Sequence, residues 1–193
     1  KDICTCEVTP QHLYFSSPDC YDLLGTNAQM NPPIRNDDHR EGLWYGIEKK
    51  VVDVIGSDHA PHTIEEKKKK YPLSPSGMTG VQTLLPIMLN FVNKNKLSIQ
   101  DLVRLISVNP CEIYKIKNKG KISLGYDADL TIIDLEKEFE ITNKWIASKS
   151  GWSPYNDTKI KGMPIFTIVN GKVVMRENEI NENAYGKSVE FSL

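Results

Sequence analysis

The sequence predicts an α/β fold that continues into a β-rich tail, and three observations support this prediction. Residues 51–55 are rich in β-branched side chains and have the length of a buried parallel strand. Apolar residues recur at helical spacing between residues 81 and 92. Near residue 118 the pattern changes to short strands and turns, so we expect two domains, over residues 1–117 and 118–193.

In the first half of the chain, strands are expected to alternate with loops and helices. A short strand over residues 3–8 should end at Thr9-Pro10, because proline cannot donate to a strand ladder. Residues 11–35 contain three prolines and a glycine, which predicts a long irregular loop of the kind that binds ligands. A helix capped by one of two consecutive aspartates should then lead into a strand over residues 51–57.

Further helices are expected between the second strand and the tail. The lysine run at residues 67–70 follows two glutamates without interleaved aromatics, which favours a solvated helical face over a nucleic-acid patch. A packed helix is predicted over residues 79–93. Ser98 should cap a second helix that extends to about residue 107, and Asn109-Pro110 should start another helical turn.

The tail is expected to be a small antiparallel structure. Short strands are predicted over residues 129–135 and 139–141, and a hairpin joins residues 165–169 to 172–175. Its connection, Asn170-Gly171, is a strong signal for a type I′ turn, since both central residues need positive φ.

Composition disfavours several classes of function. A formal charge of −1 argues against a nucleic-acid-binding face, and no apolar run approaches the roughly 20 residues of a membrane span. The four cysteines have no paired C-x-x-C spacing, which favours small buried thiols in a reducing cytoplasm over a zinc site. The expected partner is therefore a small molecule.

The candidate site lies in residues 56–62, directly after the predicted buried strand. Strand ends at the carboxyl edge of a parallel sheet are where catalytic side chains project from loops. Asp58 can serve as a metal ligand or general base, and either His59 or His62 can donate to an anionic substrate. The alternative is an ordinary capped turn.

These residues and several other stretches resemble the dihydroorotases of the amidohydrolase superfamily. The matching stretches are residues 7–13, 30–35, 56–62, 76–86, 119–122 and 125–130. The resemblance implies the C-terminal part of a (β/α)8 TIM barrel, from strand seven onward, and part of a small β-sandwich. Because such a barrel takes about 250 residues, the chain is expected to be the second half of a longer protein.

The resemblance also implies the chemistry. Dihydroorotases interconvert carbamoyl-aspartate and dihydroorotate in pyrimidine biosynthesis with two zinc ions, and Asp58 matches the aspartate that binds a metal and carries the proton. The other family ligands belong to segments that this chain lacks. His12 and His39 are weak replacements.

Substrate binding is implied for four residues. Asn31 and His62 match positions that supplement an arginine outside this chain in holding the substrate carboxylate, and Ser76 and Gly77 match a loop that meets the ring. His62 favours an anionic ring over the neutral rings of hydantoinase-type relatives, with allantoinase as an outside alternative.

A different class of function stays open. Non-catalytic dihydroorotase homologues act as structural partners of aspartate transcarbamoylase, although these typically lose metal ligands and this sequence keeps Asp58 and His62. A truncated segment without function is the third alternative. The expected protein partners are the N-terminal half of the barrel, a second copy in a homodimer, or aspartate transcarbamoylase.

Overall fold

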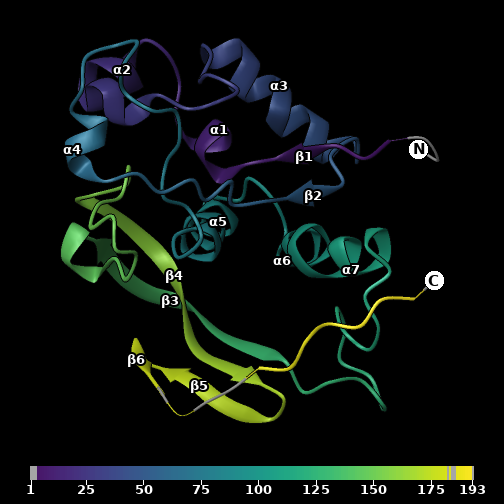
Figure 1. Ribbon diagram of the computed structural model, residues 1–193. Helices are drawn as coiled ribbons and strands as arrows, with labels where there is room; N and C mark the ends of the chain where they lie inside the picture. The colour runs from purple at the N-terminus through teal and green to yellow at the C-terminus, as the bar shows by residue number, and fades with distance from the viewer. Residues whose placement is uncertain (1–3, 182, 184–185, 193) are drawn as a thin grey trace. The chain divides into compact units, whose positions relative to one another are not determined.

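The computed structural model describes residues 4–181, 183 and 186–192 (Figure 1). The chain forms two compact units. One contains the residues up to Met88 together with Phe139–Ile160, and the other contains Leu89–Glu138 and the residues from Lys161 onward. The domain boundary near residue 118 stays a prediction.

A pair of short parallel strands forms the centre of the first unit. β1 (Glu7–Val8) pairs with β2 (Val54–Ile55), and Val8 lies opposite Ile55 (Figure 1). This confirms the predicted buried parallel strand, although β2 is shorter than expected; the predicted start of the first strand at residue 3 lies outside the described residues. Because parallel strands end at the same edge, the segments that follow Val8 and Ile55 lie together.

The segment after β1 is more helical than predicted. It contains α1 (Pro10–Tyr14), α2 (Asp19–Leu24) and a 3-10 helix (Gly25–Ala28). The Thr9 side chain accepts a hydrogen bond from the backbone N–H of His12, and proline stands at the first helical position. The expectation of a long irregular loop was therefore wrong, because Thr9-Pro10 both ends a strand and starts a helix.

Two helices flank β2 in the sequence. α3 (Asp37–Glu48) is the predicted helix and buries Trp44 and Ile47, but its N-cap residue is Asn36 and the aspartates occupy the first turn. α4 (Ile64–Lys67) begins with a capping box, in which Thr63 and Glu66 satisfy each other's backbone N–H groups. This short helix directly follows the stretch that contains Asp58 and His62.

The next helices largely follow the predicted pattern. α5 (Leu84–Asn93) begins five residues later than predicted. Ser98 caps α6 (Ile99–Val103) as predicted, by accepting a hydrogen bond from the N–H of Asp101. The helix continues as a π-helical turn (Arg104–Val108) into α7 (Asn109–Ile113).

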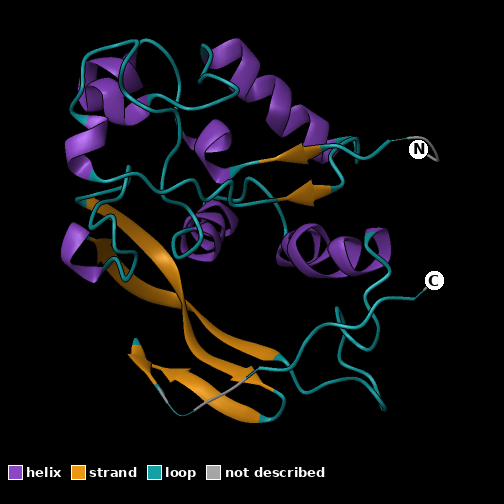
Figure 2. Cartoon of the chain, in the orientation of Figure 1, coloured by secondary structure: helices purple, strands orange, loops and turns teal. Residues whose placement is uncertain are grey.

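The tail forms a four-stranded sheet in the order β3-β4-β5-β6 (Figure 2). Its strands are β3 (Leu130–Ile141), β4 (Thr158–Val169), β5 (Lys172–Arg176) and β6 (Glu179–Ile180), with a 3-10 helix (Asn143–Trp145) after β3. Asn170 and Gly171 have φ values of 49° and 75°, which confirms the predicted hairpin turn. The two strands predicted before it are one continuous strand, and the first half of β4 was not predicted.

All four cysteines are free thiols. Cys20 is buried as expected, whereas Cys4 and Cys6 are exposed, so the expectation of buried thiols was wrong for these two. Among the described residues, no helix combines the length and apolar character needed to cross a membrane.

Candidate active site at the carboxyl edge of the parallel strands

Asp58 occupies a strained turn just after β2. Its φ is 42°, in the left-handed region that aspartate tolerates better than most residues. Gln11 stabilises this turn. Its side chain is fully buried, and its Nε2 donates a hydrogen bond to the Ser57 carbonyl at 2.9 Å. The Asp58 side chain is exposed, and in the described part of the chain its carboxylate enters no hydrogen bond or ion pair. It is therefore available to bind a ligand.

Asp58 lines a cavity of about 450 Å³ above the two strand ends. The polar and charged lining residues include Glu7, His12, Asn31, Arg35, His39 and Asp58. The structure thus brings together Asp58 and Asn31, which are 27 positions apart in the sequence.

The histidines of this cavity are already engaged. The Nε2 atom of His12 lies 2.9 Å from the Pro32 carbonyl, so it carries a proton, and Nδ1 lies 2.8 Å from the Thr9 hydroxyl. The Nδ1 atom of His39 is 2.6 Å from the Asn36 amide oxygen. Both ring nitrogens of His12 are therefore engaged, whereas the bond at His39 involves only its Nδ1.

The donor groups of the described residues form at most part of a metal centre. No three His, Cys, Asp or Glu side chains in the part of the chain that the structure describes come together as a possible metal site. The unengaged Asp58 carboxylate fits a single ligand position in a larger site. A complete ligand set would need residues beyond those described.

A second cavity, of about 780 Å³, adjoins Asn31 from the other side. It is lined by Tyr21, Gln29, Asn31, Tyr71 and Ser76 among others. Asn31 therefore faces both cavities, and Ser76 faces only the second. Of the four candidate substrate-binding residues, Asn31 and Ser76 line a cavity, whereas His62 and Gly77 line neither of the two.

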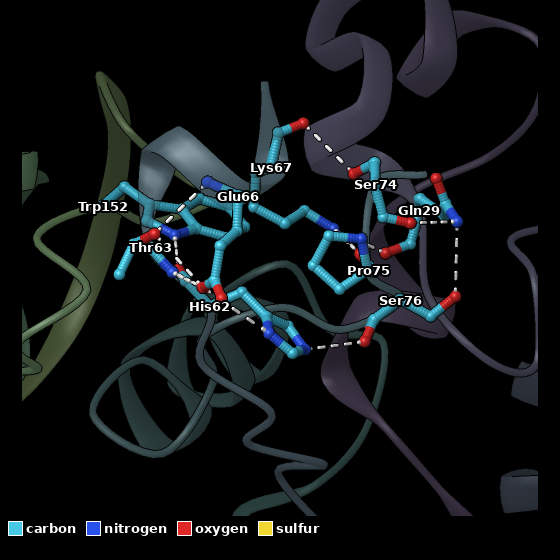
Figure 3. Close-up of polar contacts among 9 residues, drawn as sticks. All are labelled: Gln29, His62, Thr63, Glu66, Lys67, Ser74, Pro75, Ser76 and Trp152. Carbon is cyan, nitrogen blue, oxygen red and sulfur yellow. Dashed lines mark hydrogen bonds and ion pairs between the residues drawn. The ribbon is translucent and has the colours of Figure 1, made fainter. Parts of the chain in front are cut away.

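His62 is directed at the loop that carries Ser76 (Figure 3). Its Nε2 lies 3.1 Å from the Ser76 carbonyl, and its Nδ1 lies 4.0 Å from the Glu66 carboxylate. Hydrogen bonds from Thr63 to that carboxylate, with the nearby His62 as a smaller cause, lower the pKa of Glu66. Since the ring already has partners on both sides, a direct contact with a substrate requires it to exchange one of them.

Gly77 has a conformation and surroundings that exclude a side chain. Its φ is 138°, and a Cβ atom there would lie 2.6 Å from the Ala60 carbonyl oxygen. Its N–H donates to the Gln29 carbonyl at 2.9 Å. Glycine is therefore required at this position because the segments of Ala60 and Gln29 approach its backbone closely, whether or not a ligand also does.

His59 belongs to the framework of the site. Its Nδ1 accepts a hydrogen bond from the N–H of Gly80 at 3.0 Å, which ties the strand-end turn to the next loop. The choice between His59 and His62 as a donor to substrate stays open.

Lys67 differs from the prediction for the lysine run. The sequence predicts a solvated face for residues 67–70, but the Lys67 side chain is completely buried while Lys68 is exposed. The signal was the capping box at Thr63, which fixes the start of α4 and places Ile64 and Lys67 on one face. Gln11 had no comparable signal in the sequence.

The parallel strand pair with a free carboxylate at its carboxyl edge, followed by an antiparallel sheet, defines the C-terminal part of a (β/α)8 barrel with part of a β-sandwich. The chain belongs to the amidohydrolase family, whose sequence profile matches residues 3–174. These findings confirm the fold class predicted from the sequence.

Curated relatives include dihydroorotases from archaea and bacteria. The dihydroorotase of Pyrococcus furiosus is 40% identical over 183 residues, which cover 95% of this chain and 42% of the relative. The dihydroorotase of Brevibacillus brevis is 40% identical over 171 residues, covering 88% and 40%. The chain therefore spans about two-fifths of the length of the curated relatives it matches.

Solved structures with a similar fold include hydantoinases. L-hydantoinase (dihydropyrimidinase) from Arthrobacter aurescens has a TM-score of 0.86 and 33% identity, and the match covers 92% of this chain and 40% of that one. D-hydantoinase (dihydropyrimidinase) from Thermus sp. also has a TM-score of 0.86, at 23% identity over 95% and 42%, which supports the fold alone.

Proposed function

We propose that the full-length protein containing this chain is a zinc-dependent dihydroorotase, which reversibly converts N-carbamoyl-L-aspartate to dihydroorotate in pyrimidine biosynthesis. The proposal is supported by the curated dihydroorotases, which are about 40% identical over nearly the whole chain. This chain contributes the carboxyl edge of the last two barrel strands.

One observation supports the catalytic assignment most directly. Asp58 is held in a left-handed turn at the end of β2, with an unengaged carboxylate on the wall of a cavity that Asn31 shares. Backbone strain of this kind, worth on the order of 1–3 kcal/mol, is concentrated at functional sites. Asp58 accepts the proton of the attacking water on its carboxylate and returns it to the ring nitrogen as the amide bond breaks.

Asp58 is also the proposed metal ligand of this chain. Two zinc ions supply, when bound, the activation of water near neutral pH. The remaining ligands come from the part of the protein outside this chain, since the described residues offer no group of three suitable side chains.

Two of the four residues assigned to substrate binding line the cavities, and the other two lie outside both linings. Asn31 and His62 bind the substrate carboxylate, whose burial without a partner would cost several kcal/mol. Ser76 and Gly77 present backbone groups to the polar edge of the ring. Because Asn31 and Ser76 both line the larger cavity, one ligand of the size of a dihydropyrimidine can reach both.

One of the two alternatives has an observation in its favour. The 33% identity to an L-hydantoinase favours a hydantoinase-type or allantoinase-type reaction on a neutral ring, as a second candidate. A non-catalytic homologue that assembles with aspartate transcarbamoylase is disfavoured by the retained Asp58. We further propose that the chain packs against the N-terminal half of the barrel, that the protein forms a homodimer, and that it is located in the cytoplasm.

The test is ring opening of dihydroorotate by the full-length protein with added zinc. Asp58→Ala should lower the rate in both directions at least about 100-fold, the lower range for a general acid–base group. Asp22→Ala, an exposed aspartate in α2, is the matched control and should leave the rate unchanged. An Asp58→Ala enzyme that keeps about a tenth of the wild-type rate refutes the proton-transfer role.

Substrate choice is tested on the same preparation. Dihydroorotate and unsubstituted dihydrouracil differ only in the carboxylate, so a preference for dihydrouracil would favour the hydantoinase-type alternative. A protein that opens neither ring, with its metal bound, would support the non-catalytic alternative.

A further inference from the structure

Lys67 ends α4 with its side chain completely buried (Figure 3). Its ammonium Nζ donates to two backbone carbonyls, that of Gln29 at 2.9 Å and that of Pro75 at 2.8 Å. The same group lies 5.9 Å from the centre of the Trp152 ring, within the range of a cation–π contact. Lys67 thereby joins two segments that are 46 residues apart in the sequence.

The burial of this ammonium is costly. Lysine is almost never fully buried without a paired charge, and no carboxylate pairs with Lys67 in the described part of the chain. Burial alone lowers the pKa of Lys67 to about 8. An apolar side chain of the same length would fill the space without this cost. What lysine adds is the pair of hydrogen bonds to the Gln29 and Pro75 carbonyls.

One of the two carbonyls that Lys67 holds, that of Gln29, belongs to a residue of the wall of the larger cavity, and the other, that of Pro75, directly precedes the lining residue Ser76. Gln29 lines that cavity, and its carbonyl also accepts the N–H of Gly77 at 2.9 Å. Gln29 Nε2 donates to the Ser74 carbonyl at 2.9 Å, and Ser76 lines the cavity directly. Lys67 is absent from both cavity linings and lies behind this wall.

The backbone of Lys67 fixes the same two segments. Its carbonyl accepts hydrogen bonds from the hydroxyls of Thr26 and Ser74. The Pro75–Gly77 segment is thus anchored at each residue: Pro75 by Lys67, Ser76 by His62, and Gly77 by Gln29.

We propose that Lys67 is a positioning residue for the substrate site, whose ammonium fixes the Gln29 and Pro75 carbonyls and so sets the placement of Ser76, Gly77 and the His62 ring. This inference rests on the proposed function of these residues in ring binding. It assigns Lys67 no contact with substrate. Its loss should therefore weaken substrate binding more than turnover.

The test compares Lys67→Met with Lys68→Met in the full-length protein. Methionine keeps the length of the side chain without its donors, and Lys68 is the exposed C-cap residue that directly follows Lys67. Lys67→Met should raise the KM for dihydroorotate about tenfold, the effect of one lost charge-assisted hydrogen bond, with kcat changed less than about twofold. Lys68→Met should change neither constant. An unchanged KM in Lys67→Met overturns the proposal. A tenfold fall in kcat without a rise in KM overturns it as well.

A readout independent of activity separates this proposal from the proposed function. Amide hydrogen exchange of residues 75–77 should be about tenfold faster in Lys67→Met than in wild type or Lys68→Met, since the anchor is lost. If the wild-type protein does not open dihydroorotate, the proposed function fails and hydrogen exchange alone decides the positioning role. Lys67→Gln, which keeps one donor, replaces Lys67→Met if that variant is insoluble. Failure of both variants to fold overturns the proposal in favour of a purely structural role.

Discussion

The side-chain amide of Gln11 donates a hydrogen bond to the carbonyl of Ser57, 46 residues later in the chain, at 2.9 Å. Gln11 lies in α1, directly after β1, and Ser57 precedes Asp58 in the turn after β2. The contact therefore links the two strand ends beneath the candidate catalytic carboxylate. The second polar atom of the side chain, Oε1, is buried without a partner in the described part of the chain.

Gln11→Leu should separate activity from stability. Leucine has a similar volume and removes both the bond to Ser57 and the unpaired oxygen, so the free energy of unfolding should change by less than about 1 kcal/mol. The rate of ring opening should fall at least about tenfold, because the Asp58 turn loses its support. Steady-state kinetics and urea unfolding of the full-length protein measure the two effects.

Gln82→Leu is the control for that experiment. The Gln82 side chain donates to the Trp145 carbonyl at 2.9 Å and accepts from the Ala147 N–H at 2.8 Å, so both of its polar atoms are satisfied. Its loss should cost about 1–3 kcal/mol of unfolding free energy. A Gln11→Leu enzyme with wild-type activity would contradict the role assigned to the Ser57 contact.

Patterns local in the sequence predicted the elements well, and contacts distant in the sequence account for the errors. The Ser98 cap and the Asn170-Gly171 turn were predictable because each depends on a few adjacent residues. The burial of Lys67 was not, because its partners lie in two other segments. Asp58 could be chosen as a candidate from its place after a buried strand, whereas its cavity depends on how α1, α3 and the Asn31 segment fold around it.

His62→Ala should chiefly weaken substrate binding. The substitution removes a proposed partner of the substrate carboxylate. It also leaves the Ser76 carbonyl without the hydrogen bond that it accepts from His62 Nε2 in the wild-type protein, at 3.1 Å. We expect the KM for dihydroorotate to rise about tenfold, with a smaller change in kcat, as for the loss of a charge-assisted contact. Glu65→Ala, at an exposed position of α4 outside both cavity linings, should leave the KM within about twofold. Unchanged constants in His62→Ala would remove it from the site.

Gly77→Ala should destabilise the protein, whereas the same substitution at Gly42, an ordinary helical glycine, should not. At Gly77 the new Cβ meets the Ala60 carbonyl at 2.6 Å and the backbone has a φ of 138°, so the loop must move away from the strand-end segment. We expect about 2–4 kcal/mol of destabilisation together with weaker substrate binding. Gly42→Ala has open space in α3 and should stabilise by roughly 0.5–1 kcal/mol. Equal melting temperatures for the two variants would contradict the packing argument.

A matched pair of tyrosines tests the cost of an unpaired hydroxyl. Tyr155 is buried against the rings of Tyr14 and Phe15, its hydroxyl has no partner among the described residues, and burial raises its pKa well above the usual value. Tyr155→Phe should therefore be neutral or stabilise by up to about 1 kcal/mol. Tyr21 donates to the Ile34 carbonyl at 3.1 Å, so Tyr21→Phe should cost about 1 kcal/mol. Chemical unfolding gives both values, and a larger cost at Tyr155 would show that its hydroxyl is bonded.

The pH dependence of stability should reveal the buried ammonium of Lys67. Its pKa is about 8 in the folded protein against an ordinary value of 10.5, so between these pH values the unfolded chain binds more protons. The contribution of Lys67 to stability therefore rises with pH across this window, by roughly 3 kcal/mol at most, and is constant below it. The groups that face the ammonium are the Gln29 and Pro75 carbonyls and the Trp152 ring, none of which titrates there.

Unfolding free energies of wild type and Lys67→Met at pH 7 and pH 10 measure this contribution. The advantage of the methionine variant should be largest at pH 7 and should shrink as the pH rises, because deprotonation in the folded state relieves the wild-type protein of its buried charge. Lys68→Met, at an exposed position, should show a difference from wild type that does not change with pH. A Lys67→Met difference that is equally flat would mean that the ammonium keeps its ordinary pKa, so that the contacts with Gln29, Pro75 and Trp152 fully replace its hydration.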